Sequence, residues 1–224
     1  MPRTNPGRRR DAADAAIALL AECGVHGLTH RAVERAASLP AGTASNYFRT
    51  REALLIAAAE RISELHFADM DDAARMHHTA VGPNRSVTRS EMAEQVADML
   101  AESLLGAATT LRTRYLAVIE LQLEARRRPA LAAALAALQE TSISFTAGVH
   151  AQLSLPIPAE RIPTLITLYY GAMFALVTAP PETIDENSVS SIARAIVHGA
   201  LPDWQLNPVQ APREGQAPAE GPGT

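Results

Sequence analysis

The sequence predicts an all-α protein of about nine helices, and three observations point to that fold class. Alanine, the strongest helix former, occurs 44 times in 224 residues, whereas aromatic residues, which favour strands, make up 4%. Apolar residues recur at spacings of three and four from end to end, and no segment alternates convincingly between apolar and polar residues. Glycine, proline and helix-capping residues divide this pattern into separate helices.

Four helices are expected in the first third of the chain. The first stops at the glycine-containing segment 24–27. Thr29 can cap the second helix and Thr50 can cap the fourth. Residues 38–40 form a tight connection between the second and third helices. The four helices are expected over residues 6–23, 31–37, 41–47 and 51–75.

Five more helices are expected after a loop at residues 78–87. Thr88 and Glu91 form a capping box before the fifth helix, and Thr183 and Glu186 form a second one before the ninth. Pro129 opens the seventh helix, because proline fits the first turn. The five helices are expected over residues 89–105, 111–127, 129–153, 159–178 and 184–201.

The chain divides into two helical domains and a tail. Residues 1–52 are expected to form a three-helix helix-turn-helix domain, residues 53–201 a larger helical domain, and the Pro/Gly-rich residues 202–224 a disordered tail. The formal net charge of -4 is unevenly spread, because residues 1–55 carry +3 and the remainder carries -7. All basic residues are arginine. A basic first domain is what phosphate binding requires, so overall acidity does not exclude nucleic acid as a partner.

The segment of residues 28–54 carries the functional prediction. It contains two short helices joined by a tight turn and braced by longer helices. The second short helix exposes small and polar side chains, which let a helix axis come close to base edges in the major groove. Its other side offers Ala44, Tyr47 and Phe48 for packing and backbone contact. The exposed residues are Ala41, Gly42, Thr43, Ser45 and Asn46.

These residues resemble the TetR-type bacterial transcriptional regulators. The resemblance covers about fifty residues, and chain length and helix count match too. The sequence differs from the family pattern at Ser38, where glycine is usual, and at Pro40, where serine often caps a helix. It also differs at Ser45 and Asn46, where aromatic residues are common, and at Arg51, where lysine is usual. The matching residues are Gly27-Leu28-Thr29, Val33, Ala36-Ala37, Gly42-Thr43, Tyr47-Phe48 and Arg51-Glu52-Ala53-Leu54. A second match, at the junction of the sixth and seventh helices, comprises Glu120, Glu124-Ala125, Arg128 and Pro129.

The resemblance implies DNA-binding roles for individual residues. Thr29, Tyr47 and Arg51 would hold phosphates, and Arg31 would reach either phosphates or bases. Thr43, Ser45 and Asn46 would face bases, with Ala41 and Gly42 at the start of the reading helix. Core packing is the alternative for Tyr47, and a solvated surface charge is the alternative for Arg51. Arg8-Arg9-Arg10 is either an arm on the DNA or a loose tail.

The resemblance also implies a homodimer and a cavity for a small-molecule effector. Small residues recurring every four positions in the eighth helix permit close helix approach between subunits, although burial within one subunit would explain them too. For the cavity residues, ordinary core packing is the alternative. The expected interface residues are Gly171, Ala175, Ala179, Val189, Ile192 and Ile196. The expected cavity residues are Met70, Met92, Val96, Met99, Tyr115, Ile119, Gln122, Phe145, Tyr170 and Phe174.

The leading hypothesis is therefore a cytoplasmic homodimeric repressor that binds a palindromic operator and is released by an apolar or amphipathic effector. No catalytic motif occurs, so we expect no enzyme and no cofactor. We expect no membrane span at residues 162–181, because proline, threonine and tyrosine interrupt the uncharged run. One alternative is a helical binding or enzyme-like protein without DNA function. Another is a metal-responsive regulator using His66, Asp69, Asp72, His77 and His78, although we expect no metal site.

Overall fold

The computed structural model describes residues 5–80, 88–155 and 157–201, and within these ranges the chain is helical with no strand. This confirms the predicted all-α fold. The first four helices are α1 (Pro6–Gly27), α2 (His30–Ala36), α3 (Thr43–Tyr47) and α4 (Arg51–Ala80). The remainder are α5 (Arg89–Ala108), α6 (Arg112–Ala125), α7 (Pro129–Gln152), α8 (Ile162–Thr178) and α9 (Glu186–Ala200), with short 3-10 helices η1 (Ala159–Arg161) and η2 (Pro181–Thr183). The expected disordered tail lies outside the described residues.

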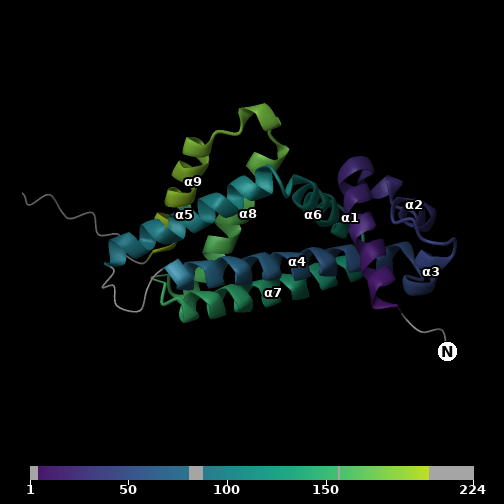
Figure 1. Ribbon diagram of the computed structural model, residues 1–224, viewed down its shortest axis with the longest axis horizontal. Coiled ribbons are helices and arrows are strands. Elements are labelled where there is room, and N and C mark those ends of the chain that lie inside the picture. Colours follow the sequence, from purple (N-terminus) through teal and green to yellow (C-terminus); the bar gives the residue numbers. More distant parts are fainter. Residues whose placement is uncertain (1–4, 81–87, 156, 202–224) are drawn as a thin grey trace, which may run out of the picture.

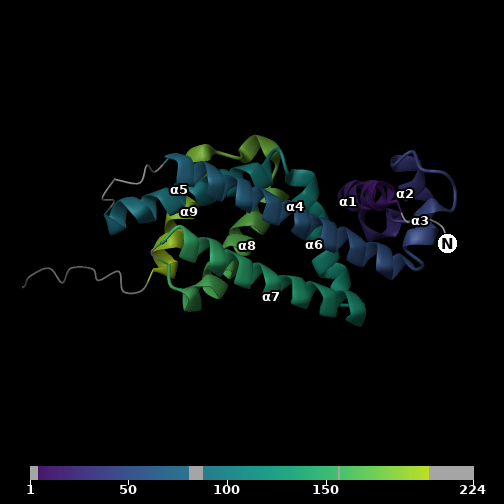
Figure 2. The ribbon, with the colours of Figure 1, turned by 60° about the horizontal axis from the view of Figure 1, so that its bottom comes forward.

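The molecule is elongated, with α1, α2 and α3 gathered at one end (Figure 1). The long helices α4 and α7 lie side by side and run from that end into the larger helical part. Figure 2 shows the same arrangement from another side, with α5, α8 and α9 far from the N-terminal end. These three helices, α1 to α3, therefore form a head at one end of the molecule, packed against α4 and α6.

Two apolar cores hold this arrangement together. The first joins α1, α2, α3 and the start of α4, and it includes the fully buried Leu20, Leu28, Val33 and Leu54. It also takes in Leu121 of α6. Helix α6 therefore packs into the core of the N-terminal head, while α5, α8 and α9 share a second core that includes Tyr115. Burial of these side chains is the main favourable term in folding.

The helix ends follow local sequence signals in most places. The side-chain oxygen of Thr88 accepts a hydrogen bond from the Glu91 backbone N–H at 3.2 Å, and Glu91 accepts one from the Thr88 backbone N–H at 2.8 Å. The first predicted capping box is thus confirmed. The second is wrong, because residues 181–183 form η2 and Asp185 caps α9 instead, accepting from the Ser188 N–H at 2.8 Å. At the predicted glycine stop, Gly24 (φ +62°) kinks α1 before one last turn to Gly27.

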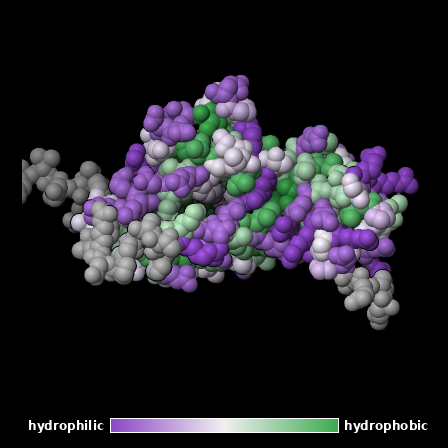
Figure 3. Space-filling view, viewed as in Figure 1, coloured by the Kyte–Doolittle hydropathy of each residue, from purple (hydrophilic) through white to green (hydrophobic). Residues whose placement is uncertain are grey.

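One side of helix α8 is buried in the protein and the other side is exposed. Together with η1 it forms a stretch, Ala159–Thr178, that is long and apolar enough to cross a membrane; a core helix passes the same test. Leu165, Tyr169 and Met173 are buried in the protein, whereas Leu168 and Phe174 are exposed. The face drawn in Figure 3 is mostly hydrophilic, with apolar residues reaching the surface at the corner where α8 leads into α9. Cys23 of α1, the one cysteine in the sequence, is exposed.

Candidate nucleic-acid interface and internal cavity

A buried glutamate fixes the position of the short helix α3. Glu34 on α2 is only 7% exposed, and its carboxylate accepts a hydrogen bond from the backbone N–H of Ala44 at 2.9 Å. The N-cap residue of α3, Gly42 (φ +82°), has no side chain for this purpose. Glu34 therefore caps α3 from the neighbouring helix, and its charge is favoured at a helix N-terminus. The sequence analysis did not identify Glu34 as a capping residue. The one signal was Pro40, which stands where a capping serine is frequent and so leaves α3 in need of another cap.

The turn between α2 and α3 contains a strained residue. Ser38 has φ +52°, in the left-handed region that favours glycine. The Leu39 backbone N–H then donates to the Glu34 carbonyl at 2.8 Å, which closes the turn. Non-glycine residues in this region cost about 1 kcal/mol. Ser38 therefore replaces the usual glycine at a position whose backbone conformation favours glycine.

The exposed side of α3 and the turn before it carries the residues predicted to face bases. Ala41, Gly42, Ser45 and Asn46 are exposed and Thr43 is partly buried, whereas Ala44 and Phe48 on the other side are buried. The Ser45 hydroxyl donates to the Gly42 carbonyl at 3.0 Å. The helix thus presents small and polar groups outward, while its inner side is packed in the core. At residues 43–47, α3 is shorter than the expected helix over residues 41–47.

Tyr47 connects α3 to the start of the chain. Its hydroxyl accepts a hydrogen bond from the Asn5 backbone N–H and donates one to the Asn5 carbonyl, both at 3.1 Å. The Asn5 side chain in turn caps α1, accepting from the Gly7 N–H at 3.0 Å. Tyr47 is therefore a structural link between the two helices as well as a surface residue.

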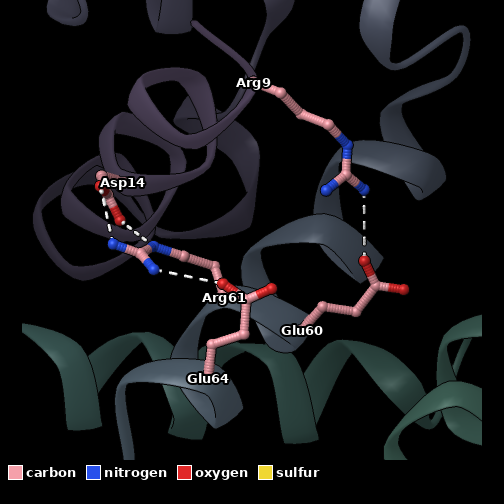
Figure 4. A network of polar contacts seen from close by, with 5 residues as sticks. All are labelled: Arg9, Asp14, Glu60, Arg61 and Glu64. Carbon is pink, nitrogen blue, oxygen red and sulfur yellow. Dashed lines mark hydrogen bonds and ion pairs between the residues drawn. The ribbon is translucent and has the colours of Figure 1, made fainter. Parts of the chain in front are cut away.

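The arginines at the start of α1 are part of that helix. Arg8, Arg9 and Arg10 are all exposed. Arg9 also lies 5.4 Å from the centre of the Phe48 ring and pairs with Glu60 of α4 at 3.4 Å. Figure 4 shows this pair beside a second one, in which the Arg61 guanidinium donates to Asp14 at 2.7 Å and to Glu64 at 3.2 Å. The Arg9–Glu60 and Arg61–Asp14 pairs join α1 to α4, whereas Arg61–Glu64 lies within α4. Each partly exposed pair contributes at most about 1 kcal/mol.

Arg51, expected to hold a phosphate, contacts the end of α1. Its guanidinium donates to the backbone carbonyl of Val25 at the end of α1, and its Nε atom is buried with no partner among the described residues. This long-range contact ties α4 to α1. Among the other expected phosphate ligands, Thr29 is exposed and also caps α2, accepting from the Ala32 N–H at 3.1 Å, and Arg31 is exposed.

Helix α6 contacts the kink in α1. The Glu120 carboxylate accepts a hydrogen bond from the Val25 N–H at 3.4 Å, and a Cβ atom at Gly24 would lie 3.2 Å from it. The same helix supplies Tyr115 and Gln122 to an internal cavity. One rigid element therefore extends from the cavity to the N-terminal head.

Two of the cavities among the described helices α4 to α8 share His66 and Tyr115 in their walls. The larger has a volume of about 490 Å³ and the smaller about 100 Å³. Of the expected cavity residues, Met70, Val96, Met99 and Tyr115 line the larger, and Tyr115, Gln122 and Tyr170 line the smaller.

The other expected cavity residues line neither of these two cavities. Ile119 is buried in the core, and Phe145 stacks on Phe67 with ring centres 4.7 Å apart. Met92 is partly buried, and Phe174 is 52% exposed on α8. Sequence reasoning missed His66 and His150 as cavity residues.

Burial favours the neutral forms of the two histidines and of Tyr115 in the larger cavity. Desolvation lowers the pKa of His66, whose Nδ1 lies 3.3 Å from the Tyr115 hydroxyl, and raises the pKa of Tyr115. Desolvation also lowers the pKa of His150 to about 4. The His150 Nδ1 atom is buried and has no hydrogen-bond partner among the described residues.

The low pKa of His150 predicts a stability loss in acid. Below pH 6.5 the unfolded chain gains a proton that the folded chain accepts only near pH 4, so stability is full above pH 6.5 and falls toward pH 4. We expect the wild-type protein to lose about 2 kcal/mol more than His150→Leu between pH 7 and pH 4.5, measured by urea unfolding. His26→Leu, at an exposed site, should behave like wild type. Equal losses in wild type and His150→Leu would contradict the prediction.

The residues expected at a dimer interface separate into two groups. Gly171 and Ala175 of α8 are exposed, and Ala179 and Ile192 are partly buried. Val189 and Ile196 of α9 are 1% and 5% exposed in the core of the subunit itself. Burial within one subunit, the alternative to an interface, therefore accounts for these two residues.

No three His, Cys, Asp or Glu side chains among the described residues lie close enough together to hold a metal ion. Within the suggested cluster, Asp69 pairs with Arg114 at 2.5 Å and Asp72 pairs with Arg75. The side chains of His77 and His78 lie outside the described part of the chain.

Comparisons with known proteins agree with this geometry. The family described as "Bacterial regulatory proteins, tetR family" matches residues 13–58, and the family described as "Tetracyclin repressor-like, C-terminal domain" matches residues 91–203. A comparison with curated protein sequences gave no match.

Several solved structures are similar over most of the chain. A member of the TetR family from Streptomyces coelicolor is 29% identical, with 88% of this chain and 100% of that one covered and a TM-score of 0.60. The multidrug binding protein EbrR, in complex with imidazole, is 26% identical over 89% of this chain and 97% of that one, with a TM-score of 0.59. A TetR-family regulator from Mesorhizobium loti, 12% identical over 88% and 96% of the two chains, shares the fold with a TM-score of 0.65.

Proposed function

The chain belongs to the tetR family of bacterial regulatory proteins, and from that premise we propose that it is a homodimeric repressor that binds a palindromic operator and is released by a small apolar or amphipathic effector. The observation that carries the proposal is the exposed side of α3, set by the Glu34–Ala44 hydrogen bond. That side belongs to the part of the chain with a net charge of +3. Basic charge supplies affinity for phosphates, and the outward polar groups read bases.

We propose a role for each of the residues predicted to bind DNA. Thr43, Ser45 and Asn46 face bases, with Ala41 and Gly42 at the point of closest approach. Thr29 contacts a phosphate, and Arg31 reaches either phosphates or bases. Tyr47 contacts the DNA backbone and also links α3 to the start of α1. Arg51 fixes α4 to α1 through the Val25 carbonyl, so we assign it a positioning role. We place the boundary between the DNA-binding and effector domains at residue 52.

Effector control requires a ligand with different affinities for two states. The cavities are lined in part by α6, which contacts the α1 kink through Glu120. We propose that a ligand shifts α6 and thereby changes the separation of the two α3 helices in the dimer, so that they no longer match both half-sites. The description of EbrR as a multidrug binding protein supports a small molecule as effector.

Two α3 helices are needed for a palindrome, so the proposal includes a dimer. Gly171, Ala175, Ala179 and Ile192 supply its surface through α8 and α9. The protein acts in the cytoplasm, where its operator is, and has no catalytic activity or metal requirement. A binding protein without DNA function is the second candidate, because the cavities alone would suit it.

The direct test is a gel shift with the DNA upstream of the protein's own gene, together with selection from genomic fragments. We expect a shift at low salt with a fragment that contains an inverted repeat. Failure to shift any fragment, with folded protein, would overturn the proposal.

Substitutions on α3 should separate base reading from positioning. Asn46→Ala should relax the preference at particular base pairs by about 1–3 kcal/mol, whereas Tyr47→Ala should weaken all sequences alike. Binding to a library of single-base operator variants measures both. A uniform loss in Asn46→Ala would show that Asn46 does not read bases.

A further inference from the structure

The charged groups around the larger cavity are mostly acidic. Asp69 of α4 and Glu102 of α5 line it, and no arginine among the described residues does. Asp69 pairs with Arg114 at 2.5 Å, so that carboxylate is compensated. Glu102 is exposed at the edge of the cavity and forms no ion pair with a described residue. The cavity wall therefore carries about one uncompensated negative charge.

The remaining polar groups do not offset this charge. His66 and His150 line the cavity, and burial lowers the pKa of both, so both are neutral near pH 7. The rest of the wall is largely apolar and includes Met70, Met76 and Met99. Thioethers are polarizable and adapt to irregular apolar ligands.

We infer that the larger cavity binds an organic cation with a bulky apolar body and discriminates against an anion of the same shape. This inference rests on the proposed function, in which the cavity holds the effector. A cation would be attracted by Glu102, whereas an anion would be repelled by Glu102 and would find the nearby Arg114 already paired with Asp69. The net charge of -7 on the chain after residue 55 acts in the same direction over longer distances. The volume of about 490 Å³ lies within the range of drug-sized sites.

Two hydrophobic ions of nearly equal size and opposite charge provide the test. Tetraphenylphosphonium and tetraphenylborate are titrated into the full-length protein by calorimetry at pH 7. We expect the phosphonium to bind at least about tenfold more tightly. Glu102→Gln should weaken phosphonium binding about fivefold and leave borate binding unchanged or stronger. Glu182→Gln, which removes an exposed charge in η2 away from the cavity, should change neither.

The ion-binding results that would overturn this inference can be told apart from a failure of the proposed DNA-binding function. Borate binding that equals or exceeds phosphonium binding would overturn the inference, and so would binding of neither ion. An unchanged preference in Glu102→Gln would overturn the assignment to this cavity. DNA binding is measured separately without either ion, so its loss would bear on the proposed function alone.

Discussion

Replacing Gly171 with arginine should convert the protein to a monomer and weaken binding to a palindromic operator by about 100-fold or more. Gly171 lies on the exposed side of α8, close in sequence to Leu168 and Phe174, which are 41% and 52% exposed. Leu168, Gly171 and Phe174 recur every three residues on α8, and apolar residues that gather on one exposed side of a helix mark an interaction site. A Cβ atom at Gly171 meets nothing within 4 Å in the subunit. Arginine should therefore leave the subunit folded but place a charge where two α8 helices meet.

Gly148→Arg is the matched control, because Gly148 of α7 is also exposed and open to a Cβ atom. Sedimentation gives the oligomeric state, and operator binding gives the affinity. We expect the control to remain a dimer with wild-type affinity and unfolding free energy. A Gly171→Arg protein that stays dimeric and binds the operator normally would place the interface elsewhere.

Replacing Glu34 with alanine should have the second largest effect. The Ala44 N–H would be left buried without a partner, at a cost of about 1–3 kcal/mol. Because α3 is positioned by this bond, we expect operator affinity to fall about tenfold or more. Removing a negative charge from the basic head would by itself strengthen DNA binding, so a loss must come from geometry.

Two variants make this result specific. Glu22→Ala removes an exposed acid from the same head and should bind the operator as well as wild type or better. Glu34→Gln keeps an oxygen acceptor and should retain more affinity than alanine. Tighter DNA binding by Glu34→Ala would show that the Glu34–Ala44 bond does not position α3.

Local signals in the sequence predicted the elements but not all of their ends. The box of Thr88 and Glu91 was predictable because both partners lie within one helical turn. Before α9, Thr183 and Asp185 are both residue types that can cap a helix. Asp185 is the actual N-cap because residues 181–183 form the 3-10 helix η2. Arg51 bonds to Val25, a partner 26 positions away, so its place depended on how α1 and α4 pack.

The candidate site was predictable from the sequence only where it depends on local signals. The exposed residues of α3 follow from local periodicity, whereas the role of Glu34 depends on Ala44 across a turn. Periodicity identifies an apolar helix face but does not say what covers it. Val189 and Ile196 therefore proved to be core residues. Cavity and core residues share the same composition, which is why Ile119 could not be separated from Met99.

The salt dependence of operator binding tests the central claim most directly. If the basic head binds DNA as proposed, log affinity should fall linearly with log salt concentration. For a dimer that contacts about six phosphates, the loss should be about 1000-fold between 50 and 200 mM salt. Preference for the palindrome over unrelated DNA should persist throughout. An affinity that is independent of salt, or equal for every sequence, would contradict the account.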